Sequence, residues 1–420
     1  MNLRRSDNSE SRFGAYVEGL VSVIGHADRA EPLRDYCVGL IMPGERKSVE
    51  PIAAETAPGR LAAQHQSLLH FVGQSPWSDE IVLSKVREMV QPALERHEPI
   101  KVWIIDDTGL PKQGKHSVGV AAQYCGQLGK QGNCQVAVSL SVANHHASLP
   151  VAYRLYLPQD WAKDDALRRK AGIPAHIGFQ TKQQIALDQL CWACEVGIPS
   201  GVVLMDSDYG RNAKLRGNIT ALGLMYVAGI QPSPLVWKPG TGPQPGRQGP
   251  KWGHRGEPSL ISVKEVALAL AEDAWRTVQW REGTADWLSS RFARLRVRVA
   301  NGDAEEWLLI EWPEDAKKPI KYWLSTLPED ISFHDLVDIA KLRWRIERDY
   351  LELKQEVGLG HYEGRGWRGF HHHATMCIAA YGFLISERET IPPSATPIAT
   401  FFPQFAIPAG YQPRGSAAAA

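Results

Sequence analysis

The sequence predicts an α/β fold with a helical N-terminal part, a strand-rich core and a β-rich insertion. Two short apolar runs, residues 102–107 and 201–206, each end in a carboxylate. Continuous apolar runs are typical of buried central strands, and open α/β sheets carry their sites where such strands end. Residues 294–299 instead alternate arginine with apolar side chains, which indicates a strand with one buried face.

The bulk composition limits the class of protein. A chain of 420 residues is long enough for two or three domains, at roughly 100–200 residues per domain. The net charge of +1 does not by itself indicate a nucleic-acid-binding protein, so any basic surface must be local. The first residues lack the apolar segment of a signal peptide, and apolar runs elsewhere are short. We therefore expect a cytoplasmic protein without a membrane span.

The first half of the chain, up to about residue 230, divides into two kinds of structure. Residues 1–98 are predicted to form a helical N-terminal domain, because apolar side chains recur there at helical spacing. Helical domains of this size often bind DNA, and the pattern equally fits any small bundle. Residues 99–230 are predicted to form the first part of the core. Further strands are expected near 117–127, 134–143 and 150–157, with a helix near 180–196.

Residues 231–332 are predicted to form a basic loop followed by the β-rich insertion. The loop, residues 231–258, carries seven Pro and six Gly, with four Lys or Arg against one acid. Such a segment cannot bury enough apolar surface to fold alone, so it is either a solvated linker or becomes ordered on a partner. Ser262 and Glu265 then form a capping box, which predicts a helix through Ala274.

Helices are expected again from residue 333 to 390. One long helix over about 333–357 would place Arg343, Glu347 and Lys354 within roughly 40° of one another, at about 100° per residue. This stripe is either a solvated face with ion pairs or part of a site. The tail, 391–420, is rich in Pro and then Ala and is expected to be disordered.

The two aspartates that end the first apolar run cannot share one ligand. Successive side chains of a strand point to opposite faces, so one of Asp106 and Asp107 is a candidate metal ligand and the other a turn or cap residue. Lys112, Lys115 and Lys130 follow before the next acid, Asp160, so an anionic substrate would suit this surface. The alternative is that Asp-Asp-Thr-Gly merely ends a strand and begins a turn.

These motifs resemble the DDE transposases of bacterial insertion sequences. The shared features are Asp-Thr after one buried strand, Asp-x-x-Tyr-Gly after a second, and Arg-x3-Glu-x6-Lys on a late helix. Longer strings at residues 105–120, 291–297 and 358–367 are similar to the insertion sequence 701 family in particular. The similarity runs from about residue 20 to 390. One departure is Ala340, where related transposases have a tyrosine three positions before the Arg.

The resemblance implies a ribonuclease-H-like catalytic core, with residues 333–390 completing it after the insertion. Carried over by motif, the catalytic and metal-binding carboxylates are Asp107, Asp206 and Glu347, and Asp106 is the rival for the first position. Three carboxylates brought together repel unless divalent cations lie between them. Two Mg²⁺ ions are therefore expected, for which Mn²⁺ can substitute.

The activity implied is binding of terminal inverted repeats, cleavage at the element ends and joining of 3′-hydroxyls to target DNA. Because two ends must be joined together, we expect a homodimer assembled on double-stranded DNA. Alternatives are a catalytically inactive, transposase-derived DNA-binding protein and a metal-dependent phosphodiesterase. A set of basic and aromatic residues is expected to contact DNA: Arg343, Lys354, Lys112, Lys115, Arg294, Arg296, Arg298, Arg365 and Trp367.

Overall fold

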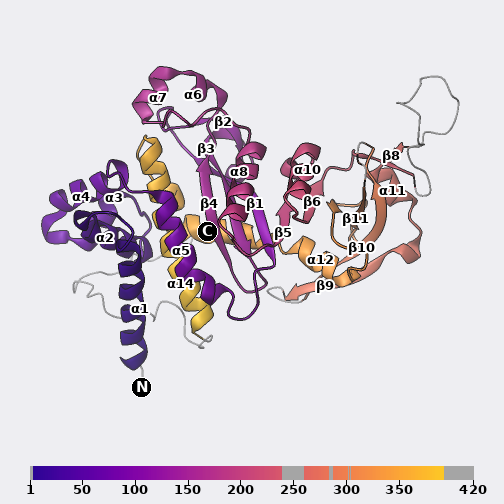
Figure 1. Cartoon of the computed structure of the whole chain (residues 1–420), viewed down its shortest axis with the longest axis horizontal. Coiled ribbons are helices and arrows are strands. Elements are labelled where there is room, and N and C mark those ends of the chain that lie inside the picture. The colour runs from indigo at the N-terminus through magenta and orange to yellow at the C-terminus, as the bar shows by residue number, and fades with distance from the viewer. Residues whose placement is uncertain (1–2, 239–259, 283–286, 301, 303, 392–420) are drawn as a thin grey trace, which may run out of the picture.

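The helices and strands lie in three groups along the longest axis of the molecule (Figure 1). The N-terminal helices are at one end, a mixed sheet with its helices is in the middle, and the later strands are at the other end. The computed structural model describes residues 3–238, 260–282, 287–300, 302 and 304–391. Most of the predicted basic loop and nearly all of the predicted disordered tail lie outside these residues.

The first part of the chain is helical, as predicted. Its helices pack around the last helix, α14 (Trp367–Thr390), so the two ends of the chain share one core. The hydroxyl of Tyr16 donates to the carbonyl of Ala379, and the hydroxyl of Tyr36 pairs with His373. The elements are α1 (Leu3–Val21), η1 (Ala27–Arg29), α2 (Ala30–Ile41), α3 (Val49–Thr56), η2 (Pro58–Arg60), α4 (Leu61–Gly73) and α5 (Asp79–Leu94).

The central sheet is built around β1 (Val102–Pro111), which pairs parallel with β5 (Val202–Met205) and antiparallel with β3 (Lys130–Ala143). On the β5 side, β6 (Tyr226–Ile230) continues the parallel arrangement. On the other side, β3 pairs with β2 (Ala121–Cys125) and β4 (Ser148–Leu155). Strands β1, β5 and β6 are almost wholly buried, which explains their continuous apolar sequences. The connecting helices are η3 (Gly126–Leu128), α6 (Gln159–Lys163), α7 (Asp165–Ala171), α8 (Lys182–Glu195), α9 (Ser207–Gly210) and α10 (Ala213–Ala221).

The predicted β-rich insertion extends this same sheet. Strand β12 (Lys321–Ser325) pairs antiparallel with β6, and β11 (Glu305–Glu311), β10 (Trp287–Arg298) and β9 (Arg276–Glu282) follow outward in that order. Beside them, β7 (Leu235–Trp237) and β8 (Leu260–Ser262) form a small second sheet. The capping box of Ser262 and Glu265 is present, but its helix, α11 (Val263–Ala269), ends earlier than predicted, and η4 (Glu272–Ala274) follows.

The predicted long helix is wrong in one respect, because the chain forms two helices. Helix α12 (Phe333–Lys341) ends in a turn in which the amide of Leu342 donates to the carbonyls of Asp338 and Ile339. Helix α13 (Trp344–Gln355) then begins with Arg343 as its N-cap residue, and η5 (Leu359–His361) follows α13. Both turn residues keep right-handed helical dihedral angles, so the apolar periodicity continues across the break and hides it.

None of the helices in the described ranges is long and apolar enough to cross a membrane.

Candidate active site

Asp106 and Asp107 point to opposite faces of β1 and have different partners. The carboxylate of Asp106 accepts a hydrogen bond from the guanidinium of Arg343 at 2.7 Å. Asp107 instead pairs with Lys182, the first residue of α8, at 2.7 Å, and accepts from the hydroxyl of Tyr209 at 3.4 Å. Strand alternation therefore separates the two carboxylates, and only Asp106 faces α13.

Asp206 lies beside Asp106 at the end of the neighbouring strand. In the parallel pair of β1 and β5, Ile104 is opposite Leu204, so the aspartates two residues further along end at the same level. Asp206 caps α9, and its carboxylate accepts from the amides of Asp208 and Tyr209 at 2.9 and 3.2 Å. Both carboxylates thus lie at the carboxyl end of a parallel strand pair, the usual place for a site in an α/β sheet.

Burial makes the charged forms of these aspartates costly. It raises the pKa of Asp106 to about 7; the guanidinium of Arg343 opposes this rise, and the carboxylates of Asp206 and Asp107 add to it. Burial likewise raises the pKa of Asp206, again opposed by Arg343. Carboxylates held close together in a buried place are typical of cation-binding and catalytic sites.

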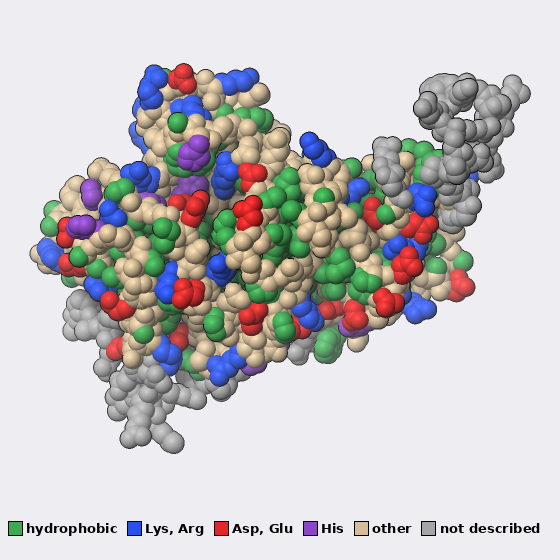
Figure 2. Space-filling model, viewed as in Figure 1, with side chains coloured by type: hydrophobic (Ala, Val, Ile, Leu, Met, Phe, Trp, Pro, Cys, Tyr) green, Lys and Arg blue, Asp and Glu red, His purple; other side chains and the backbone are tan. Residues whose placement is uncertain are grey.

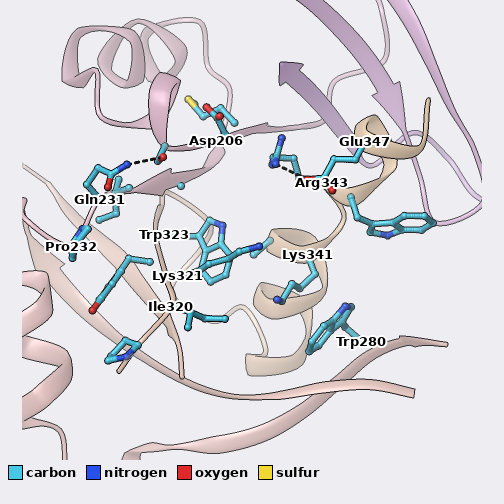
Figure 3. A pocket seen from close by; sticks show the side chains of 18 of the residues that line it. Asp206, Gln231, Pro232, Trp280, Ile320, Lys321, Trp323, Lys341, Arg343 and Glu347 are labelled. Atoms are coloured by element: carbon cyan, nitrogen blue, oxygen red, sulfur yellow. Dashed lines mark hydrogen bonds and ion pairs between the residues drawn. The ribbon is translucent and has the colours of Figure 1, made fainter. Parts of the chain in front are cut away.

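Arg343 joins the aspartates to the predicted glutamate. One guanidinium nitrogen donates to Asp106, and another donates to Glu347, one turn along α13, at 2.9 Å. Figure 3 shows Arg343 pointing toward Glu347, with Asp206 on the neighbouring wall of the same pocket. Burial alone would lower the pKa of Arg343, but the carboxylates, led by Asp106 and Glu347, raise it. The break before α13 thus places a permanent cation among the acids.

Two further lysines support the backbone near this site. Lys354, from the last turn of α13, donates to the carbonyl of Gly109 on β1 at 3.1 Å. Lys112 donates to the carbonyl of Tyr362 at 2.7 Å, and burial lowers its pKa to about 8. Both lysines are partly buried, so the first role of each is to stabilise the backbone that it contacts.

A pocket of about 770 Å³ opens beside the acids. Asp206, Arg343 and Glu347 line it from the core, and side chains of β9 and β12 line it from the insertion. The volume of the pocket is in the range of ligand-binding clefts, so the pocket offers more space than the carboxylates themselves occupy. The insertion strands therefore form part of the candidate site, because they supply its second wall.

The carboxylates suit a hard divalent cation. Asp106, Asp206 and Glu347 offer oxygen ligands, which Mg²⁺ and Mn²⁺ prefer. Within the described part of the chain, no three His, Cys, Asp or Glu side chains are close enough together to hold a metal ion as they stand. Arg343 lies between Asp106 and Glu347, so these two carboxylates share a cation of the protein itself. The donor chemistry therefore fits, and Arg343 would have to give way.

Comparison with known proteins shows the family of this chain. Residues 19–286 match the family described as DDE superfamily endonucleases. The chain belongs to this family. It is also 25% identical, over 322 residues, to the probable transposase for insertion sequence element IS701 of Microchaete diplosiphon. That alignment covers 76% of this chain and 73% of the relative. The resemblance to insertion sequence 701 transposases is thereby confirmed.

Membership of the DDE family implies a ribonuclease-H-like core, and the large mixed sheet agrees with that class of fold. The family match ends at residue 286, so it contains Asp106, Asp107 and Asp206 but neither Arg343 nor Glu347. The late pair is connected to the early carboxylates by the contacts in the structure.

The arginines of β10 in this DDE endonuclease are less exposed than the sequence predicted. Arg294 donates to the carbonyl of Ile331 at 2.6 Å, and its guanidinium lies 4.5 Å from the ring centre of Trp307. Arg296 lies 5.1 Å from the same ring and donates to the carbonyl of Glu305. Arg298 is also only partly exposed. The period of two is confirmed, but the arginine face packs on aromatic and backbone groups and is not a freely solvated stripe.

Trp367 is not placed to contact DNA. Only 8% of it is exposed, because it begins α14 and its ring packs against His371 at 4.4 Å between ring centres. Trp367 was predicted to contact DNA, but an apolar ring at the start of a buried helix packs in the core. Lys115 and Arg365, by contrast, are exposed at the surface.

Two residues of the site were not predicted from the sequence. Lys182 carried no motif that distinguishes it from other helix-starting lysines. Tyr209 belongs to the Asp-x-x-Tyr-Gly string, so its position was marked, but its partner Asp107 was not foreseen. Both side chains bind the carboxylate of Asp107, on the face of β1 that points away from α13.

Proposed function

We propose that this DDE endonuclease is a transposase that binds terminal inverted repeats, cleaves the element ends and joins the 3′-hydroxyls to target DNA. The observation that carries the proposal is that Arg343 pairs with both Asp106 and Glu347, while Asp206 lines the same pocket as Arg343 and Glu347. The named relative supports the same function, because it is a probable transposase.

In this proposal Asp106, and not Asp107, supplies the first carboxylate. Asp106 faces α13, shares Arg343 with Glu347 and lies level with Asp206. Asp107 is on the opposite face and is neutralised by Lys182. The three proposed metal ligands are therefore Asp106, Asp206 and Glu347, and Asp107 is a positioning residue that connects β1 to α8 through Lys182.

The proposed chemistry is a displacement at phosphorus. Two divalent cations bound by these carboxylates would activate the attacking oxygen and stabilise the leaving oxygen. Arg343 keeps Asp106 and Glu347 on the same side of the pocket, and its planar guanidinium is suited to bind a phosphate once it leaves them. Lys354 holds the backbone of β1 directly behind the acids and presents a cation near the same edge.

The proposed working unit is a homodimer on DNA, because each active site acts on one transposon end and both ends are joined in one event. It would act in the cytoplasm, associated with the nucleoid when bound to DNA. On the face shown in Figure 2, cationic and anionic side chains are interspersed, in agreement with the net charge of +1. DNA binding is therefore proposed to depend on local groups of cations and not on the whole surface.

A cleavage assay tests this function. Purified protein is incubated with a labelled duplex that carries the inverted repeat flanking its gene, with Mg²⁺, with Mn²⁺ or with EDTA. We expect nicks with 3′-hydroxyls at the element boundary in either metal and none in EDTA, and none from Glu347→Gln. Binding of the duplex without cleavage in either metal would instead indicate a transposase-derived DNA-binding protein. Hydrolysis of a small phosphodiester in the absence of DNA would indicate a phosphodiesterase.

A further inference from the structure

The part of the pocket that the insertion lines carries cations that the proposed catalytic mechanism does not use. Lys264 lies on α11, Lys318 precedes β12, and Lys321 begins β12. All three are exposed, and within the described part of the chain none has an ion-pair partner. They come from two segments of the insertion that are more than fifty residues apart in the sequence, and they line one pocket.

Two other cations that line the pocket are already used by the fold. Lys341 is partly buried and paired with Glu311 at 2.6 Å, and its ammonium lies 4.3 Å from the ring centre of Trp280. The guanidinium of Arg281 lies 3.8 Å from the ring centre of Trp344. These two side chains are therefore engaged within the protein. The three exposed lysines leave their charges available to a ligand.

Three exposed lysines that line one pocket give it positive charge that an anionic ligand can neutralise. The acids that line the pocket, Asp206 and Glu347, are the proposed metal ligands, so they are not available as partners for the lysines. Lysine acts as a point charge that contacts phosphate without selecting a base. A polyanion whose charges repeat along its length would satisfy several such lysines at once, whereas one small anion would satisfy one.

We propose that Lys264, Lys318 and Lys321 bind the phosphate backbone of the DNA strand that continues from the scissile phosphate. The proposal rests on the proposed transposase function and adds to it the path of the DNA. In this arrangement the core supplies the catalytic wall of the pocket, and the insertion supplies the wall that holds the DNA backbone. The contacts are independent of base sequence, so they position the substrate and do not select it.

The salt dependence of DNA binding tests the proposal. Each phosphate neutralised by a lysine contributes about 0.9 to the slope of log K against log salt for duplex DNA. The triple variant Lys264→Gln, Lys318→Gln, Lys321→Gln is therefore expected to lose up to about 2.7 from the slope measured on the end duplex. The corresponding triple change to Arg, which keeps the charges, is expected to retain the slope of the wild-type protein.

A matched control removes the same charge elsewhere. Lys163, Arg169 and Lys170 are exposed on α6 and α7, in a separate lobe, and their triple change to Gln is expected to leave the slope unaltered. An equal loss of slope in this control would contradict a DNA contact that is local to the three pocket lysines. An unchanged slope in the pocket variant, or a loss of slope in the Arg variant, would contradict it too. Exposed substitutions of this kind usually change stability by less than about 0.5 kcal/mol, and melting temperatures verify folding.

The cleavage assay on the same preparations separates this proposal from the proposed function. An unchanged slope in the pocket variant, with a wild-type protein that cleaves in Mg²⁺ or Mn²⁺, would refute DNA binding by the three lysines and leave the catalytic function standing. A reduced slope in the pocket variant, with a wild-type protein that cleaves in neither metal, would support DNA binding by the three lysines and refute the catalytic function.

Discussion

Exchanging the two neighbouring aspartates for asparagine separates their roles. Asp106→Asn removes a carboxylate that shares Arg343 with Glu347 and lies level with Asp206, so we expect end cleavage to fall below detection. The variant is expected to stay folded, because burial already disfavours the charge of Asp106, whose side chain is 17% exposed. Binding of end DNA should change little, since DNA docking depends mostly on phosphate contacts.

Asp107→Asn is expected to be much milder. It breaks the ion pair with Lys182. The side chains of Lys182 and Asp107 are 29% and 27% exposed, and such a pair contributes about 0.2–1 kcal/mol to stability. Residues that only support a metal ligand typically change metal affinity or activity by about 10–100-fold. We therefore expect residual, measurable cleavage at no less than about one hundredth of the wild-type rate.

The measurement is single-turnover cleavage of a labelled end duplex in Mg²⁺ and in Mn²⁺, together with melting temperatures. Asp188→Asn is the matched control, because Asp188 lies on α8 and pairs with Arg154 at the surface without reaching the site. It should cleave at the wild-type rate. Near-normal cleavage by Asp106→Asn, with none by Asp107→Asn, would refute the assignment of the first carboxylate.

Two further predictions concern ion pairs, those of Arg343 and those of His145. Arg343→Gln frees Asp106 and Glu347 from their shared cation, so without DNA the variant should bind Mn²⁺ at least about tenfold more tightly in calorimetry, equivalent to about 1.4 kcal/mol; weaker binding would mean that Arg343 assists the metal. His145 contacts Asp338 at 2.5 Å and Glu98 at 2.8 Å; the hydrogen bond to Asp338, and to a smaller extent that to Glu98, raises the pKa of His145. That stabilisation is complete below the ordinary histidine pKa of about 6.5 and is lost as pH rises through the raised value. His145→Gln should therefore destabilise the protein at pH 6 and converge with wild type toward pH 9 in urea unfolding, and a constant difference across this range would contradict the assignment.

The sequence predicted the strands of the site better than the choice of carboxylate. The apolar runs before Asp107 and Asp206 predicted buried strands, and alternation along β1 required its two aspartates to face apart. Which face is catalytic depends on where α13 packs, and this packing is a tertiary contact between residues more than two hundred positions apart. Sequence motifs alone favoured Asp107, because Asp-Thr was the matching string.

The remaining differences also come from packing that periodicity does not report. The period of two correctly predicted that Arg294 and Arg296 share one face of a strand, but Trp307 from the next strand lies under both guanidinium groups. The break between α12 and α13 was missed because Leu342 and Arg343 keep helical dihedral angles while the hydrogen-bond pattern changes. The three lysines of the pocket were not predicted because separate segments of the chain bring them together.

Anomalous diffraction from crystals grown with Mn²⁺ and end DNA tests the central claim most directly. We expect manganese peaks within ligand distance of the carboxylates of Asp106 and Asp206, with Glu347 completing the site and Arg343 displaced from between Asp106 and Glu347. A peak bound by Asp107, with Lys182 displaced and Asp106 still paired to Arg343, would contradict it.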